Sequence, residues 1–171
     1  RSTLFPYTTL FRSTNLISVN DFEQMQEAIS QERQTREKVR YYPINEAAAK
    51  RAKEMNSFSD YTLGSATLEY KSLVDQATEI AKSQKEKVDP SFHDKIDALL
   101  DTYAKRLAAN MNNGFAIDAR VPSVLIAGGS NFPVRKKEKQ NAARDKNFSE
   151  WKEIQGLLEK IRSTGMGGIS A

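Results

Sequence analysis

The chain has 171 residues, carries a formal net charge of +4 and contains no cysteine. This length suffices for one domain with a buried core, whereas the lack of thiols excludes a disulfide framework, a thiolate metal site and a cysteine nucleophile. Without disulfides, a cytoplasmic location is the simpler expectation. No apolar run approaches the roughly 18 residues of a membrane-spanning helix, so we expect no membrane contact.

The first thirteen residues, RSTLFPYTTLFRS, back-translate without mismatch to a nucleotide sequence that resembles a widely used short-read sequencing adapter. We therefore expect residues 1–13 to be adapter-derived and disordered, and we exclude them from reasoning about the fold. Without Arg1 and Arg12 the net charge falls from +4 to +2, so the global charge says little about partners. The glycine-rich residues 165–171 predict a flexible truncated tail, as expected of a metagenomic gene fragment.

The first predicted helix carries an apolar stripe formed by Phe22, Met25 and Ile29. The polar residues 31–40 after it form either a solvated face or a partner-binding extension. Pro43 ends this helical pattern, because proline disfavours helix at the residue before it.

A short helix is predicted at residues 46–55, where Ala, Lys and Glu predominate and Asn45 can serve as the N-cap. Residues 56–65 have the composition of a loop. We expect three apolar side chains to pin this loop to the core: Phe58, Tyr61 and Leu63.

Two long helices joined by a tight junction are predicted over residues 65–113. At the junction Asp89 is the cap and Pro90 takes the first helical position, and Gly114 is the predicted end of the second helix. That helix carries the clearest apolar stripe of the chain, formed by Phe92, Ile96, Leu99, Leu100, Tyr103, Leu107 and Met111. These features predict an antiparallel helical hairpin.

The apolar run at residues 122–127 can be a short strand, a buried extended segment or a helical turn. Pro133 then opens a helix over residues 133–164, whose second half has a predicted core face formed by Phe148, Trp151, Ile154, Leu158 and Ile161. The sequence therefore predicts a single all-α domain over residues 14–164, a hairpin or bundle of about five helices, in which residues 122–127 are the one place for a short extended segment.

The first half of this last helix is strongly basic, with six basic and two acidic residues between residues 135 and 147. A helix that is polar all round needs solvent or a partner, and Lys and Arg at this density can neutralise phosphates. The predicted nucleic-acid-binding residues are Arg135, Lys136, Lys137, Lys139, Gln140, Asn141, Arg144 and Lys146. The alternatives are a solvated helix and a protein-binding surface.

A glycine pair precedes this helix. Backbone N–H groups in such a turn can bind an anion at a helix start, and the residues that would do so are Gly128, Gly129, Ser130 and Asn131. The pattern is neither a dinucleotide-binding fingerprint nor a P-loop, so the alternative is a plain turn with an N-cap.

No catalytic group is predicted from the sequence. His93 is the only histidine, and a metal site usually needs more than one His or Cys ligand. Ser130 has no identifiable base to form a triad with. We therefore predict no catalytic residue, no metal and no cofactor.

The stretch PSVLIAGGSNFPVRKKEKQN at residues 122–141, together with Trp151 and IRSTG at residues 161–165, resembles proteins carried by phages and integrative elements of gut Firmicutes, whose function is not known. The resemblance covers most of residues 41–171. It implies a longer native protein and a mobile-element context, but no activity or site. A more distant likeness is to short phage and plasmid proteins with histidines in the turn, where this chain has glycines.

Three functions are compatible with these patterns. The first is an accessory protein of a phage or conjugative element that binds DNA or RNA through residues 133–147. The second is a helical interaction or scaffold module, which meets a protein partner or a second copy through residues 31–40, the basic helix or the face of Leu99, Tyr103 and Leu107. The third is a fragment of an enzyme whose site lies beyond residue 171.

Overall fold

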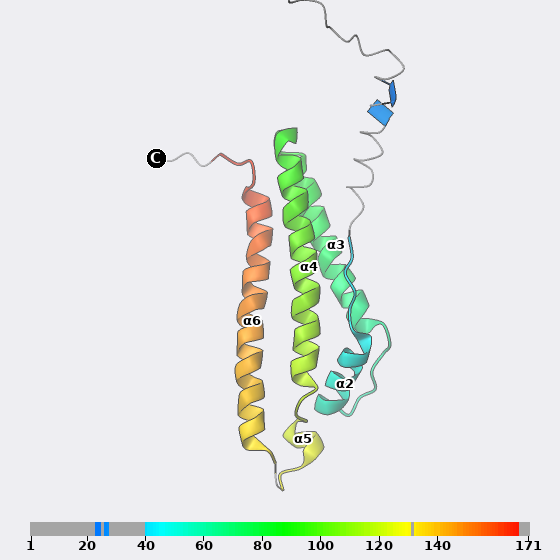
Figure 1. The fold of residues 1–171 in the computed structure, drawn as a ribbon, viewed down its shortest axis with the longest axis vertical. Coiled ribbons are helices and arrows are strands. Elements are labelled where there is room, and N and C mark those ends of the chain that lie inside the picture. Colours follow the sequence, from blue (N-terminus) through cyan, green and yellow to red (C-terminus); the bar gives the residue numbers. More distant parts are fainter. Residues whose placement is uncertain (1–22, 25, 28–39, 131, 168–171) are drawn as a thin grey trace, which may run out of the picture. The chain divides into compact units, whose positions relative to one another are not determined.

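The computed structural model describes residues 23–24, 26–27, 40–130 and 132–167 (Figure 1). The chain divides into two compact units, Arg1–Lys38 and Val39–Ala171. In the first unit residues 23–24 and 26–27 are helical. The adapter-like residues 1–13, the predicted stripe of the first helix and nearly all of the polar stretch 31–40 lie outside the described residues. The second unit contains all the remaining described residues.

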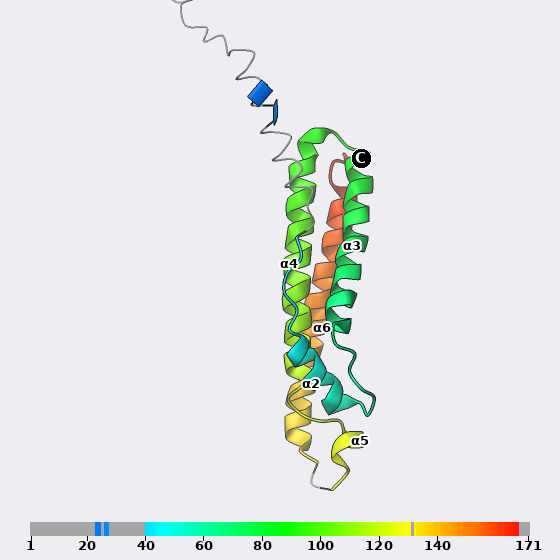
Figure 2. The same cartoon turned by 90° about the vertical axis from the view of Figure 1, so that its right-hand side faces the viewer.

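Helices alone form the regular structure of the described part of this second unit. They are α2 (Glu46–Asn56), α3 (Ser65–Lys85), the 3₁₀ turn η1 (Pro90–Phe92), α4 (His93–Asp118), α5 (Val124–Ala127) and α6 (Val134–Ser163). The predicted all-α fold is thus confirmed. The long helices α3, α4 and α6 run alongside one another in alternating directions, and α2 and α5 pack near the end where α4 finishes (Figures 1 and 2).

The core lies between α3, α4 and α6. Tyr70 of α3, Leu107 of α4 and Ile154 of α6 are fully buried in its larger cluster. A smaller cluster, toward the η1 end of the bundle, contains Ile96 and Ile161. Burial of each such side chain contributes roughly 1.5–3 kcal/mol before the loss of conformational entropy is subtracted. The packing of these apolar faces therefore fixes the position of α6 against α4.

The helical hairpin has the junction that the sequence predicts, but its second helix is longer. Asp89 Oδ1 accepts a hydrogen bond from Ser91 N at 2.8 Å and so caps η1. The prediction that Gly114 ends the helix is wrong, because α4 continues to Asp118. At Gly114 a Cβ atom would lie 3.2 Å from Asn147 Nδ2. The glycine therefore permits the close approach of α6 to α4 instead of ending a helix.

Helix α2 is capped as predicted, since Asn45 Oδ1 accepts a hydrogen bond from Ala48 N at 2.9 Å. Its buried face consists of alanines, which let α2 approach α4 closely. The loop after α2 departs from the prediction, because Phe58 is 81 % and Leu63 is 79 % exposed. Of the three side chains predicted to pin this loop, Tyr61 is the one in contact with a helix, because its hydroxyl donates a hydrogen bond to Glu46 of α2. A polar contact therefore fixes this loop where the sequence predicts apolar packing.

Of the three alternatives that the sequence leaves open for residues 122–127, the helical turn is the one that forms. Residues Val124–Ala127 form the helical turn α5, and Ser123 N donates a hydrogen bond to Met55 O at 2.8 Å. A lone strand would have left its backbone groups unpaired. The helical turn satisfies several of them internally and ties the segment to the end of α2.

The predicted core face of α6 is confirmed at Ile154, Leu158 and Ile161, but it is wrong at Phe148 and Trp151. Gln140, Ile154 and Ile161 are buried, and they lie at intervals of seven residues or multiples of seven. The predicted core residues Phe148 and Trp151 are 55 % and 38 % exposed, respectively. The packing against α4 therefore buries Gln140 in the first half of α6 and leaves Phe148 and Trp151 outside the core.

Candidate functional site

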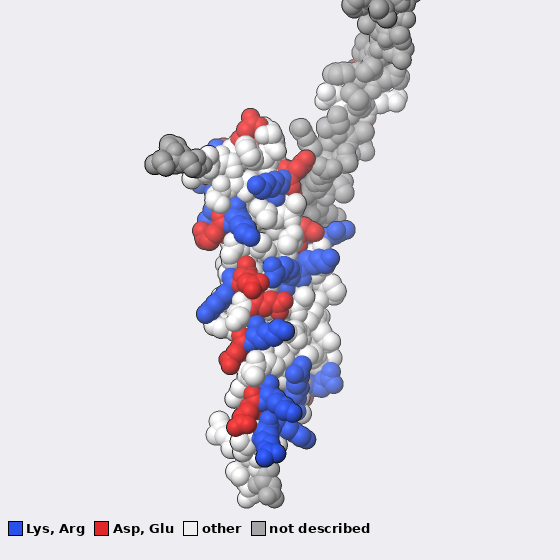
Figure 3. Space-filling model, turned by 60° about the vertical axis from the view of Figure 1, so that its left-hand side comes forward, with Lys and Arg blue, Asp and Glu red and all other residues white. Residues whose placement is uncertain are grey.

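The basic residues predicted to bind nucleic acid lie at the start of α6. Figure 3 shows Lys and Arg gathered at this end of the bundle, whereas farther along both charge signs alternate. Four of these side chains are exposed and have no ion-pair partner among the described residues: Arg135, Lys136, Lys139 and Lys146. We refer to these four as the basic surface. The acids Glu138 and Asp145 are exposed among them.

The predicted residues do not share one face of the helix. Arg135, Lys139 and Lys146 have an i, i+4, i+11 spacing and so lie on one flank of α6. Lys137 and Arg144 are seven residues apart and lie on another flank, which faces Asp118 of α4. The core residues separate the two groups. A ligand that touches both groups must therefore extend around the start of the helix or across its exposed side, where Glu138, Asn141 and Asp145 lie.

Arg144 is engaged within the protein. Its Nε group donates a hydrogen bond to Asp118 Oδ1 in an ion pair, and its Nη2 group lies 3.3 Å from Asn56 Oδ1. The residue thus joins α6 to α4 and α2. The prediction of Arg144 as a free phosphate ligand is corrected accordingly, because much of its hydrogen-bonding capacity is already used.

The prediction of Gln140 as a nucleic-acid contact is wrong. Its side chain is 1 % exposed, so it cannot reach a nucleic acid. Its Nε2 group donates hydrogen bonds to Ile117 O at 2.7 Å and Asp118 O at 3.3 Å. The last carbonyl groups of a helix lack partners within that helix. Gln140 therefore caps the end of α4, a role that depends on tertiary packing and has no signal in the sequence.

Lys137 is half-buried on the flank of Arg144. Burial lowers its pKa, and the nearby Arg144 guanidinium lowers it further, while Asp118 opposes both effects. Asn141, the last residue of the predicted set, is exposed. Burial is thus the main cause of the lowered pKa of Lys137.

The glycine turn closes α5 and does not adjoin α6. Gly128 has a φ of 74°, which favours glycine, and its N–H donates to Val124 O at 2.9 Å. Gly129 and Ser130 are exposed, and Asn131 lies outside the described residues. Helix α6 begins three residues farther on, after Pro133, without a side-chain cap and without an acid in its first turn.

A groove between α4 and α6 lies beside these residues, and the sequence does not indicate it. Its cavity volume is about 310 Å³. The lining residues are Asn110, Gly114, Ile117, Asp118, Arg144, Asn147, Phe148 and Trp151. The one signal in the sequence is the pair of aromatic residues directly after the basic run, which the apolar periodicity assigns to the core.

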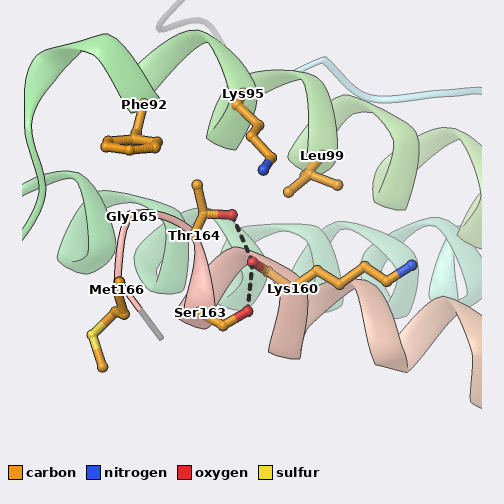
Figure 4. Close-up of a pocket in the computed structure, with 9 residues that line it drawn as sticks. Phe92, Lys95, Leu99, Lys160, Ser163, Thr164, Gly165 and Met166 are labelled. Carbon is orange, nitrogen blue, oxygen red and sulfur yellow. Dashed lines mark hydrogen bonds between the residues drawn. The ribbon is translucent and has the colours of Figure 1, made fainter. Parts of the chain in front are cut away.

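A second cleft of about 420 Å³ lies at the opposite end of the bundle (Figure 4). Phe92, Leu99 and Met166 provide apolar walls, and the Lys95 side chain points into the cleft. Gly165, whose φ is 77°, also lines the cleft. Leu99, which the sequence analysis places on a face for a protein partner or a second copy, lies here, whereas the residues predicted to bind nucleic acid do not.

His93, the one histidine of the chain, has a structural contact in the described residues. His93 Nε2 lies 3.1 Å from Lys85 O, so this histidine joins η1–α4 to the end of α3. No group of three His, Asp or Glu residues within the described part is placed to hold a metal ion. Likewise, no helix of that part has both the length and the apolar character needed to cross a membrane.

No protein-family model, curated protein or solved structure matches this chain.

Proposed function

We propose that this chain is a nucleic-acid-binding accessory protein of a mobile element, which contacts phosphates through the basic surface at the start of α6. The observation that carries the proposal is the exposure of four cations with no ion-pair partner among the described residues. The resemblance of residues 122–141 to proteins of phages and integrative elements supports the mobile-element context.

The helix end itself favours an anionic ligand. A helix N-terminus carries a positive partial charge, yet Arg135 and Lys136 occupy the first turn of α6 and no acid balances them. No side chain caps this end. Val134 N donates to Phe132 O and Lys137 N to Pro133 O, so within the described residues the N–H groups of Arg135 and Lys136 remain available as donors. A phosphate at this position would offset the repulsion and accept these hydrogen bonds.

Such a surface predicts binding that depends on phosphate charge and not on base sequence. Each phosphate neutralised on duplex DNA contributes about 0.9 to the slope of log K against log salt. Contacts from all four residues of the basic surface would give a slope of about −3.6 on duplex DNA and about −2.8 on a single strand.

The test is a fluorescence-anisotropy titration of the full chain against labelled duplex and single-stranded DNA between about 50 and 200 mM salt. We expect the variant Lys136→Glu/Lys139→Glu to weaken binding to every sequence and to reduce the slope by about 2. The matched control is Lys87→Glu/Lys95→Glu, which makes the same change in charge at the opposite end of the bundle.

The control variant should bind almost as the parent does, because charges farther apart than the Debye length of about 8–10 Å are screened. Equal weakening by both variants would show that net charge alone drives the binding. Absence of binding at low salt would reject the proposed function.

A second candidate function, protein interaction, has its own supporting observation. Phe58, Leu63 and Leu125 are each more than three-quarters exposed, and large exposed apolar side chains are a feature of interaction sites. The face of Leu99, Tyr103 and Leu107 cannot serve this purpose, because Tyr103 and Leu107 are buried in the core. Salt-insensitive self-association in sedimentation, lost on Phe58→Ser, would favour this second function.

A further inference from the structure

Phe148 and Trp151 form an aromatic pair on the surface of α6. Their ring centroids lie 5.8 Å apart, and their planes are nearly parallel, with an angle of 7°. Phe148 is 55 % and Trp151 is 38 % exposed. Exposed aromatic rings lose the hydrophobic stabilisation that burial would give, so a ligand that covers the pair would gain it. A flat apolar ligand suits this surface best.

The groove beside the pair is shaped for a ligand with a polar edge. Gly114 leaves one wall without a side chain, and Ile117 adds an apolar contact. Asn147 Oδ1 accepts hydrogen bonds from Asn110 and Asn113, which orients its Nδ2 group. Within the described residues that Nδ2 group donates no hydrogen bond, so it remains available to an acceptor in the groove.

Positive charges lie on both sides of the aromatic pair. Lys152 Nζ is 4.7 Å from the centroid of the Phe148 ring. In the other direction, Lys137 and Arg144, the latter paired with Asp118, precede Trp151 on the same flank at intervals of seven residues, about 10 Å each. A chain of phosphates that runs along this flank from the start of α6 would therefore pass the aromatic pair.

We infer that the ligand of this region is single-stranded nucleic acid, with an unpaired base stacked on Phe148 and Trp151 at the mouth of the groove. The inference rests on the proposed function and specifies its ligand class. A duplex keeps its bases stacked within the helix, whereas a single strand can place a base on an aromatic side chain. Combined stacking and phosphate contacts are the usual recognition mode of proteins that bind single strands.

Trp151 is the only tryptophan of the chain, so its fluorescence reports directly on stacking. The full chain is titrated with an oligo-dT strand of about 12 nucleotides, with an abasic strand of the same length and with a matched duplex. We expect the oligo-dT strand to quench the tryptophan fluorescence and to bind more tightly than the abasic strand. The abasic strand and the duplex should bind through phosphate contacts without quenching.

Two substitutions test the aromatic pair, with binding measured by anisotropy. Phe148→Leu and Trp151→Leu should each weaken oligo-dT binding about 5- to 150-fold, the range expected for loss of one stacked base. Both should leave duplex binding unchanged. Phe58→Leu is the matched control, because it makes the same change at an exposed phenylalanine that does not line the groove. Circular dichroism of each variant verifies the fold.

The outcomes separate the two proposals. Equal affinity for oligo-dT and the abasic strand, without quenching, would overturn the stacking inference and leave phosphate binding intact. Loss of all binding in the parent chain would reject both proposals. A groove occupied instead by a second copy would appear as a dimer in sedimentation that Trp151→Leu dissociates, and this result would also overturn the inference.

Discussion

The carboxylate of Glu46 in α2 accepts a hydrogen bond from the backbone N–H of Thr67 in α3, at 2.7 Å. The same carboxylate accepts hydrogen bonds from the Thr67 hydroxyl and from Gly64 N. Gly64, the N-cap residue of α3, has no side chain with which to cap the helix. Glu46 therefore supplies the cap from a different helix and joins α2 to the start of the long hairpin.

Replacement of Glu46 by Gln should destabilise the protein in a pH-dependent manner. Hydrogen bonds from the Thr67 and Tyr61 side chains lower the Glu46 pKa from 4.5 to about 2. Because the folded-state pKa is depressed, its stabilising effect is fully present above pH 4.5 and is lost as the pH falls toward 2. We expect Glu46→Gln to reduce the free energy of unfolding by about 1 kcal/mol at about pH 7, and this difference should shrink in acid.

Urea unfolding monitored by circular dichroism at several pH values measures this effect. Glu69→Gln is the control, because Glu69 is exposed on α3 and accepts no hydrogen bond from a described residue. A constant difference between Glu46→Gln and the parent from neutral pH down to the folded-state pKa would contradict the assigned role of the carboxylate.

Gln140→Ala should destabilise the bundle without changing the electrostatics of nucleic-acid binding. The substitution removes the Nε2 donor to Ile117 O, which still accepts a hydrogen bond from Arg120 N at 3.1 Å. Loss of one such hydrogen bond costs about 0.5–1.5 kcal/mol. Asn141→Ala, one residue along and exposed, should change the free energy of unfolding by less than about 0.5 kcal/mol. Chemical denaturation measures both variants. A Gln140→Ala variant as stable as Asn141→Ala would refute the capping role.

The contrast between Gln140 and Asn45 shows how far the sequence predicts this structure. Asn45 acts through neighbours in the chain, as does the Asp89–Pro90 junction, and such local signals predict the structure correctly. Gln140, Gly114 and Glu46 act across helices, so their roles depend on which faces meet. For α6 the sequence predicts one apolar face, and only packing shows that its first two members, Phe148 and Trp151, stay outside the core. The basic surface is predictable because charge clustering needs no tertiary information.

Gly165→Ala should destabilise the end of the bundle where α6 finishes. Gly165 has a φ of 77°, and a Cβ atom there would lie 2.8 Å from Val88 Cγ1 and 2.9 Å from Val88 Cβ. Both the left-handed backbone and the contact disfavour a side chain, at a cost of about 1–3 kcal/mol. Gly167→Ala is the control, because no atom lies within 4 Å of its Cβ position. Thermal unfolding should show a lower Tm for Gly165→Ala alone.

The Arg144–Asp118 ion pair should couple α6 to α4 by about 1 kcal/mol or less, since both side chains are 37 % exposed. A double-mutant cycle with Arg144→Ala, Asp118→Ala and the double variant measures this coupling. This coupling should fall at about 1 M salt, where the Debye length is near 3 Å.

The variants Arg144→Ala and Asp118→Ala should also move the Lys137 pKa in opposite directions. Loss of Arg144 removes a neighbouring positive charge and raises it, whereas loss of Asp118 removes a compensating negative charge and lowers it further. Salt-independent coupling, or shifts of the Lys137 pKa in the same direction, would show that packing and not charge joins these helices.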